Sequence, residues 1–136
     1  MLTLELAQQL KTAGLVWTPA SGDRFIVPVE DMEDRVFFLS DVTADIHRFA
    51  SGDLIGFNGT TEWALDSIEQ ERVVWFPRED QLRVLLGAAF SRLEQVSGGY
   101  AVTATAAGGV EARFIDIDPE RAYARALLSR LAPPKG

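Results

Sequence analysis

Apolar residues at helical spacing predict a helix near the start of the chain. Leu6, Leu10 and Ala13 recur every three or four residues, which places them on one face of a helix. Thr3 suits the N-cap position, and Gly14 can end the helix in a left-handed conformation. We therefore predict a short helix over residues 3–13.

A second strong helix signal lies near the other end of the chain. Asp118-Pro119-Glu120 combines an N-cap, a proline at the first helical position and an acidic residue in the first turn. The helix is expected to end before Pro133-Pro134, and residues 133–136 are expected to form a flexible tail. Four residues of this helix are predicted to face inward: Tyr123, Ala126, Leu127 and Leu131.

Short runs of β-branched and aromatic residues between turn signals predict five strands in the first part of the chain. Their ranges are 24–29, 36–39, 45–49, 54–57 and 73–76. The unbroken apolar run at 36–39 is typical of a strand that is buried on both faces. Pro28 has no N–H to donate, so the first strand lies at a sheet edge or ends there.

Two further helices are predicted between these strands and the end of the chain. One begins at Thr60 or Thr61 and runs to about Glu71. A longer one begins at Pro77 and ends at Gly98-Gly99. Its predicted apolar stripe consists of Leu82, Leu85, Leu86, Ala89, Leu93 and Val96.

Residues 100–106 and 110–117, joined by Ala107-Gly108-Gly109, form the clearest predicted hairpin. The first of these strands consists mostly of alanine and threonine. Such small side chains allow a helix to approach closely, or they leave a flat surface for a partner. The sequence leaves both alternatives open.

The order of these elements predicts an α+β fold. We expect an antiparallel sheet of about five to seven strands, with three to four helices packed against it. The chain of 136 residues has the usual length of one domain, and it contains no internal repeat and no long linker. We therefore predict a single domain over residues 1–136.

Charge and composition narrow the range of partners. The formal net charge is −7, and the arginines are scattered along the sequence, so a nucleic-acid partner is not expected. The absence of cysteine excludes disulfides, thiolate metal sites and cysteine nucleophiles. No apolar run is long enough to span a membrane, and no signal peptide is recognisable. The chain is interpreted as cytoplasmic.

The turn after residues 54–57 is a candidate ligand site. Asn58, Gly59, Thr60 and Thr61 join a strand to a predicted helix N-terminus, where free amides can bind an anion such as phosphate. A Walker loop would need a lysine before the Ser/Thr, and this turn has none. The other interpretation is a plain turn with a threonine cap.

His47 is the only histidine, and it follows Asp45 by two residues on a predicted strand. On a strand both would project from one face, which could supply two metal ligands or a general base near the turn. A metal needs a third and usually a fourth ligand, which the sequence does not indicate. We therefore predict no metal, no cofactor and no catalytic residue, and we keep His47 as a candidate ligand-binding residue.

The three tryptophans are candidate interaction residues. Trp63 lies away from the apolar face of the predicted helix over residues 61–71, so a large aromatic ring there needs a cover. The cover is either Trp75 and its neighbours within the fold, or the surface of a partner protein. Trp17 presents the same two alternatives.

Four segments of the chain resemble a family of small bacterial proteins, mostly actinobacterial, that carry no established function. They are Leu2-Thr3-Leu4-Glu5-Leu6-Ala7, Ala13-Gly14-Leu15-Val16-Trp17, Gly56-Phe57-Asn58-Gly59-Thr60-Thr61-Glu62-Trp63-Ala64-Leu65 and Trp75-Phe76-Pro77-Arg78-Glu79-Asp80-Gln81-Leu82. Some members bear a pilus-assembly label, but the ATPase of that name needs a phosphate-binding loop with lysine, which this chain lacks. The resemblance implies a bacterial cytoplasmic protein and supplies no catalytic residues.

The leading functional hypothesis is a non-enzymatic protein-interaction or regulatory module. Its partner would be an unidentified protein or a second copy of the chain, contacted through exposed aromatics and the acidic surface. The alternative is a small-ligand binding protein or a minor enzyme, with an anion or phosphate site at the turn over residues 56–63.

Overall fold

The computed structural model describes residues 1–29, 35–39, 44–49, 52–57, 67–69 and 72–131. The chain divides into two compact units. The terminal unit consists of Met1–Val16 and Pro77–Gly136, and the central unit consists of Trp17–Phe76. Each unit is described by itself below. The single domain over residues 1–136 stays a prediction, and the expected tail at 133–136 lies outside the described residues.

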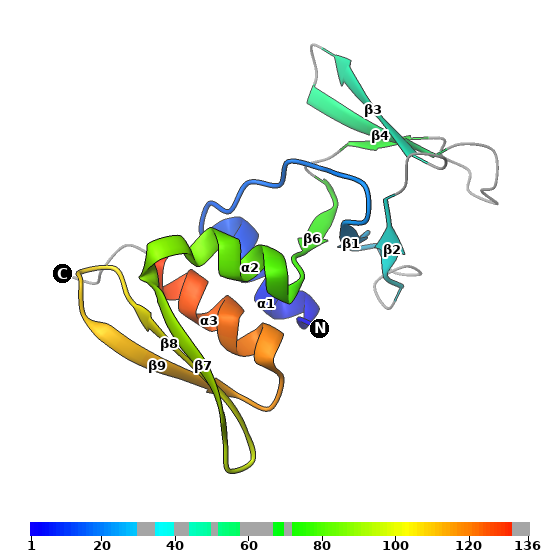
Figure 1. The fold of residues 1–136 in the computed structure, drawn as a ribbon. Coiled ribbons are helices and arrows are strands. Elements are labelled where there is room, and N and C mark those ends of the chain that lie inside the picture. The colour runs from blue at the N-terminus through cyan, green and yellow to red at the C-terminus, as the bar shows by residue number, and fades with distance from the viewer. Residues whose placement is uncertain (30–34, 40–43, 50–51, 58–66, 70–71, 132–136) are drawn as a thin grey trace. The chain divides into compact units, whose positions relative to one another are not determined.

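The terminal unit combines the three described α-helices with one antiparallel sheet (Figure 1). The sheet has the strand order β7-β8-β9. The helices and strands of the terminal unit are α1 (Leu4–Thr12), α2 (Glu79–Leu86), the 3-10 turn η2 (Gly87–Ala89), β7 (Phe90–Val96), β8 (Gly99–Thr105), β9 (Glu111–Asp116) and α3 (Pro119–Leu131). The hairpin predicted from residues 100–117 is confirmed as β8 and β9.

The first helix forms as its sequence predicts. Thr3 is the N-cap, and its hydroxyl accepts a hydrogen bond from the Leu6 amide at 3.1 Å. Gly14 follows the helix with a φ of 108°, a conformation that favours glycine. Leu6 and Leu10 are buried, so the predicted apolar face of α1 is confirmed.

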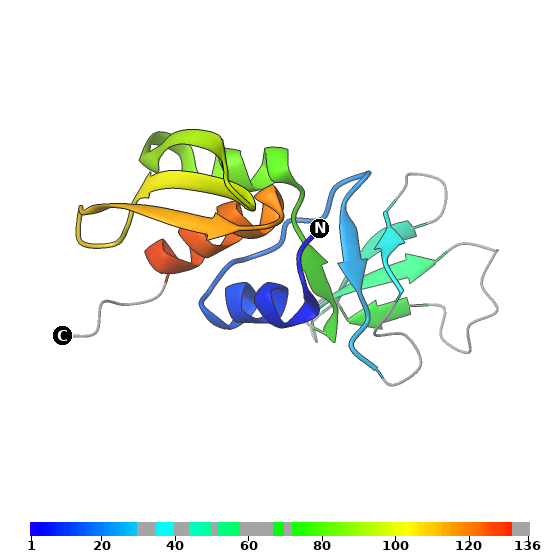
Figure 2. The same ribbon diagram turned by 90° about the horizontal axis from the view of Figure 1, so that it is seen from below.

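The last helix, α3, lies at the centre of the terminal unit and contacts α1, α2, β8 and β9. Figure 2 shows α3 running along the sheet. Asp118 caps its first turn by accepting a hydrogen bond from the Glu120 amide at 2.8 Å. Tyr123 is 1% exposed, and its ring stacks on Phe90 of β7 with 5.5 Å between centroids. The Arg83 guanidinium of α2 lies 4.7 Å above the same Phe90 ring. The Phe90 ring of β7 thus contacts both α3, through Tyr123, and α2, through Arg83.

The long helix predicted from Pro77 to Gly98-Gly99 is wrong in its second half. The helix ends at Leu86, and Gly87 follows with a φ of 54°. Residues 90–96 are the strand β7, which pairs with β8 from Phe90↔Ala104 to Val96↔Gly99. Pairing with a strand further along the chain outweighs the helical spacing of the apolar residues, because each strand residue gains ladder hydrogen bonds and a buried face.

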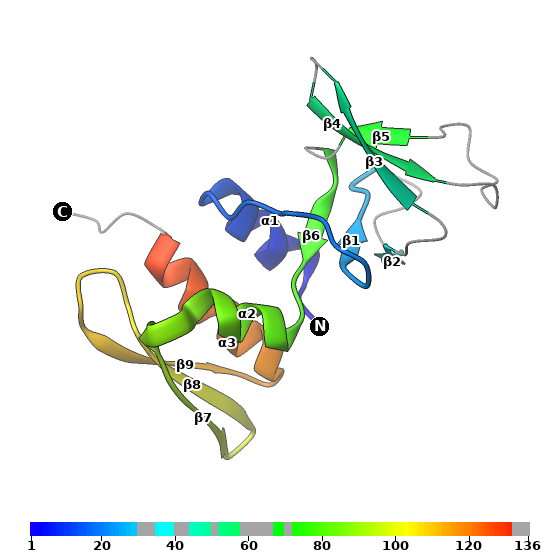
Figure 3. The same ribbon diagram turned by 45° about the horizontal axis from the view of Figure 1, so that its top comes forward.

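The central unit contains two antiparallel sheets within its described residues (Figure 3). One has the order β2-β1-β6, and the other has the order β3-β4-β5. Their bounds are β1 (Arg24–Ile26), β2 (Phe37–Phe38), β3 (Ala44–Phe49), β4 (Gly52–Phe57), β5 (Ser67–Glu69) and β6 (Val74–Phe76). Each of the five predicted strands therefore overlaps an observed strand.

Two predictions for the central unit are wrong. The helix expected from Thr60 or Thr61 to about Glu71 is contradicted at Ser67–Glu69, which form β5 and pair with β4 through Leu54↔Glu69 and Ile55↔Ile68. Its other residues lie outside the described ranges. The strand expected to be buried on both faces is only the two-residue β2, and Phe38 in it is 63% exposed. An apolar run alone does not fix burial, because a short edge strand has one neighbour and one covered face.

The α+β class is confirmed, since helices and antiparallel sheets occur in separate stretches of the chain. The predicted sheet of five to seven strands is not confirmed. The described strands instead form three separate sheets of three strands each. Three α-helices are described, which lies within the predicted number of three to four.

Candidate functional site

The backbone brings His47 close to the strand that leads to the predicted ligand turn. In the β3–β4 ladder Asp45 pairs with Gly56, and His47 pairs with Leu54. Asn58, Gly59, Thr60 and Thr61 lie outside the described residues, so the ligand turn stays a prediction. In the part of the chain that the structure describes, no group of three or more His, Cys, Asp or Glu side chains could hold a metal ion.

Trp17 belongs to the core of the central unit. Its ring is 7% exposed and stacks on Trp75, with 6.4 Å between centroids and 13° between planes. Its indole Nε1 donates a hydrogen bond to Asp23 Oδ2 at 2.9 Å. Trp17 therefore presents little surface to a partner, because both its apolar ring and its polar atom are occupied within the unit. Trp63 lies outside the described residues.

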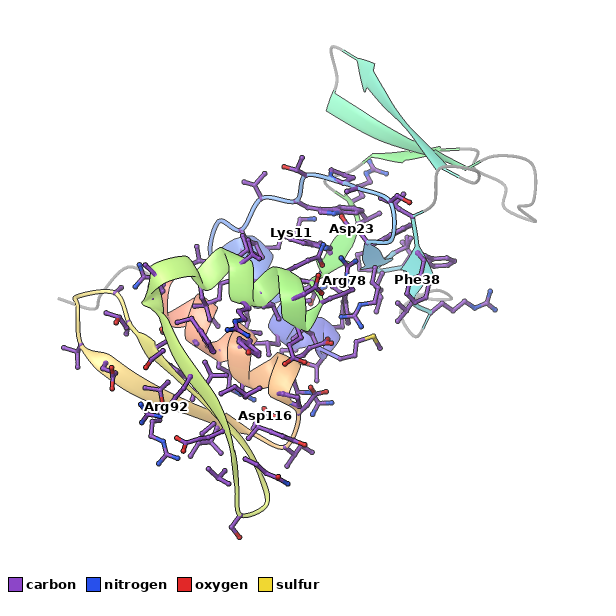
Figure 4. The ribbon with its side chains drawn as sticks, viewed as in Figure 1. Lys11, Asp23, Phe38, Arg78, Arg92 and Asp116 are labelled. Carbon is purple, nitrogen blue, oxygen red and sulfur yellow. The ribbon has the colours of Figure 1, made fainter. Side chains whose placement is uncertain are left out.

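Asp23 holds the loop between Trp17 and β1 in place. Its side chain is buried, and Oδ2 accepts a second hydrogen bond from the Ala20 amide at 2.9 Å. Its backbone carbonyl accepts a hydrogen bond from the Leu39 amide at 2.9 Å, which ties the loop to the end of β2. Figure 4 shows Asp23 beside β1, with Phe38 on β2. A buried carboxylate that accepts hydrogen bonds from several donors stabilises the local structure.

Trp75 completes an aromatic row across the sheet β2-β1-β6. Phe25 pairs with Phe37 on one side and with Trp75 on the other, and Phe25 is fully buried. Trp75 itself is partly buried, and its Nε1 is a buried donor without a hydrogen-bond partner. Cross-strand aromatic pairs of this kind stabilise a sheet. Trp17 and Trp75 thus contribute to the core of the central unit, and their role in binding a partner stays a prediction.

The sheet β7-β8-β9 of the terminal unit has two very different faces. The inner face lies against α3: Phe90 stacks on Tyr123, and Asp116 Oδ2 accepts a hydrogen bond from Arg125 Nε at 2.9 Å. Residues directly opposite one another in an antiparallel ladder share a face. The pairs Phe90↔Ala104 and Tyr100↔Asp116 therefore assign the even-numbered residues of β8 to the inner face.

The outer face is made by the alternate residues of the same strands. Ala101 and Thr103 of β8 occupy its centre, and Thr103 pairs with Arg92 on one side and Arg113 on the other. Ala101 likewise pairs with Glu94 on one side and with Ile115 on the other. In Figure 4 the labelled Arg92 lies on the side of β7 away from α3. Together with Glu111, which pairs with Thr105, these residues define the outer face, and Ile117 follows β9 directly.

Charged side chains bridge the outer face above its central strand. Glu94 Oε1 lies 3.4 Å from Arg113 Nη2 and 3.5 Å from Arg92 Nε. The pair of Glu94 and Arg113 joins β7 to β9, so it crosses β8. This explains why Ala101 is 0% and Thr103 1% exposed although α3 packs on the opposite face of β8. The Thr103 hydroxyl is buried beneath the bridge and has no hydrogen-bond partner.

Beside the charged bridge, apolar side chains at the end of β9 are exposed. Ile115 is 56% exposed, and Ile117 directly after β9 is 73% exposed. Gly99 of β8 lies beside them, and a Cβ there would collide with the Asp116 carbonyl oxygen. The backbone at residues 116 and 117 approaches β8 so closely there that only glycine fits.

The outer face could not be assembled from the sequence, because residues 90–96 were predicted as a helix. The sequence did carry one signal, the small side chains of β8, for which two alternatives were open. The structure shows the first, since α3 packs on the inner face of β8; a flat surface for a partner stays a prediction. The sequence did not indicate that Glu94 and Arg113 form an ion pair across the sheet.

None of the helices in the described ranges is long and apolar enough to cross a membrane. Comparison with family models, with curated proteins and with solved structures finds no match to this chain. The resemblance to a mostly actinobacterial family therefore stays a prediction, and the functional argument depends on the geometry of the chain itself.

Proposed function

We propose that this protein is a non-enzymatic protein-interaction module that contacts its partner through the outer face of β7-β8-β9. The observation that carries the proposal is the pair of exposed isoleucines, Ile115 and Ile117, beside a row of charged residues. Interfaces commonly combine an apolar centre with a polar rim. The outer face offers both within three strands.

The position of Ile115 on β9, with Ile117 directly after it, supports the proposal. Within the described residues β9 pairs with β8 alone, so it is an edge strand. Natural proteins usually protect edge strands with charges, prolines or bulges, because an exposed apolar edge favours aggregation. Arg113 and Glu111 follow this rule, whereas Ile115 and Ile117 depart from it. Such a departure is explained when the residues are covered in the working state of the protein.

The charges of the outer face favour a protein partner. Arg92 and Arg113 are matched by Glu94 and Glu111, so the face carries both signs in equal number. A nucleic-acid surface concentrates positive charge, which the outer face does not do. A protein surface with alternating signs can complement this pattern.

Site-specific photo-crosslinking tests the proposal. A photoreactive amino acid replaces Ile115 in one variant, and Val84 of α2 in the matched control, since Val84 is 78% exposed but lies on another surface of the terminal unit. We expect irradiation in cells to give a discrete adduct from position 115 and none from position 84. No adduct at 115, or the same adducts at both positions, would contradict the proposal.

The alternative function is a small-ligand site at the turn over residues 56–63, near His47. It is supported only by the pairing of His47 with Leu54 on β4, the strand that leads to that turn. A thermal-shift screen against phosphates, nucleotides and metal ions tests it, because a ligand at 100 times its dissociation constant stabilises by about 2.7 kcal/mol. The absence of any shift would remove these ligand classes.

A further inference from the structure

We infer that the partner on the outer face is a second copy of this chain, packed sheet against sheet about a two-fold axis. The inference rests on the proposed function and names its partner. A two-fold interface places the same surface on both sides, so that surface must complement itself. The charges and the apolar residues of the outer face both meet this requirement.

The charge balance of the outer face allows two copies to meet there. The whole chain carries −7, so two copies repel each other over most orientations. The outer face carries two arginines and two glutamates: Arg92, Arg113, Glu94 and Glu111. Its net charge is therefore zero. Glu94 of one copy can accept hydrogen bonds from Arg113 of the other in exchange for the contact it makes within its own chain.

The exposure of these side chains allows that exchange. Arg113 is 49% exposed, Glu94 40% and Arg92 55%. Their ion pairs therefore lie at the surface, where such pairs are weak and are remade easily. Asp116 on the inner face, by contrast, is only 8% exposed and is held by Arg125.

The apolar part of the outer face fits a second sheet. Two sheets pack face to face at about 10 Å, with side chains of both faces interdigitating. Ile115 is 56% exposed on this face, and Ile117, directly after β9, is 73% exposed. In a two-fold arrangement the isoleucines of one copy can therefore pack against those of the other.

A charge-exchange experiment tests this inference. One variant carries Arg92→Glu and Arg113→Glu, which makes the outer face acidic, and the other carries Glu94→Arg and Glu111→Arg, which makes it basic. We expect each variant alone to associate at least about tenfold more weakly than the parent in sedimentation velocity, because like charges then face each other. The two variants mixed are expected to form a heterodimer. A mixture that stays monomeric would overturn the inference.

A second set of variants guards against effects on folding. Ile115→Lys is expected to keep the circular dichroism spectrum of the parent but to remain at 15.0 kDa at concentrations where the parent doubles its mass. Val84→Lys, at a more exposed position on α2, is expected to dimerise as the parent does. A parent that stays at 15.0 kDa throughout, or equal dimerisation of both variants, would also overturn the inference.

The two proposals can fail separately. A crosslinked adduct of twice the chain mass at position 115 supports both. An adduct of any other mass, together with a monomeric parent in sedimentation, overturns the second copy and retains the interaction surface. No adduct together with a monomeric parent overturns both.

Discussion

The two faces of the sheet β7-β8-β9 are covered in different ways, although the same strand β8 lies at the centre of both. On the inner face Val102 and Ala104 are buried beneath α3, with Tyr123 stacked on Phe90. On the outer face Ala101 and Thr103 are equally buried, but the cover consists of charged side chains that reach across from neighbouring strands.

The helix that covers the inner face is a permanent part of the fold, whereas the charged side chains that cover the outer face can be replaced by another molecule. Packing of a helix against a sheet removes apolar surface from water and holds it at native density. Ion pairs between half-exposed side chains contribute little free energy and can be exchanged for contacts with another molecule. The inner face is therefore expected to control stability, and the outer face association. Each prediction below tests this division, beginning with the largest effect.

Removal of the inner aromatic stack should cost the most stability. Tyr123→Ala deletes a ring that is 1% exposed and stacked on Phe90, so we expect a loss of about 3–5 kcal/mol in the free energy of unfolding. Tyr123→Phe keeps the ring and should retain most of that stability. Urea denaturation measures both, and equal losses in the two variants would contradict a role for the ring.

The same residue should make the inner face sensitive to alkaline pH. Burial raises the pKa of Tyr123 above its ordinary value of 10.0, and the nearby Glu79 charge raises it further, against the opposing effect of Arg83. A raised pKa in the folded state means that this contribution to stability is complete below pH 10 and is lost as the pH rises through the folded-state pKa. Denaturation at increasing pH should show this loss in the parent, and less of it in Tyr123→Phe.

On the outer face, removal of a hydroxyl should increase stability. The Thr103 hydroxyl is buried without a partner, and Thr103→Val replaces it by a methyl group of similar size. We expect a gain of about 1 kcal/mol, because an unsatisfied buried polar group costs about 1–3 kcal/mol. Thr103→Ser is the matched control, since it keeps the hydroxyl and loses the methyl, and it should destabilise. A less stable valine variant would show that the hydroxyl has a partner in solution.

The smallest effect is expected from the charged bridge itself. Glu94→Gln removes both ion pairs with Arg92 and Arg113, which are 3.4–3.5 Å long and half exposed. We expect a change in the free energy of unfolding of less than about 1 kcal/mol in dilute solution. Thermal denaturation at low protein concentration measures it. A larger loss would mean that the bridge is part of the fold rather than a replaceable cover.

The sequence was sufficient where local signals determine the structure. Thr3 and Gly14 delimit α1, Asp118 and Pro119 start α3, and the glycines at 108 and 109 make the turn of the hairpin. Each signal acts through a backbone conformation or a hydrogen bond within a few residues. Such features can be predicted without knowledge of the rest of the fold.

Elements that depend on distant partners could not be predicted. Residues 90–96 have apolar residues at helical spacing, and their conversion to β7 depends on pairing with β8. Residues 67–69 became a strand in the same way, through pairing with β4. The outer face requires all three strands in register before Glu94 meets Arg113. The predicted ligand turn at Asn58–Thr61 and Trp63 lies outside the described residues and gains no support from these strands.

The most direct test of the central claim is isoleucine-methyl NMR of the parent protein over a dilution series. We predict that the methyl signals of Ile115 and Ile117 shift together as the concentration rises, since Ile115 is exposed on the outer face and Ile117 is exposed directly after β9 in a single copy. The signal of Ile26, which is 4% exposed in the central unit, should remain in place. Signals of Ile115 and Ile117 that do not change with concentration would contradict the claim that the outer face receives a second copy.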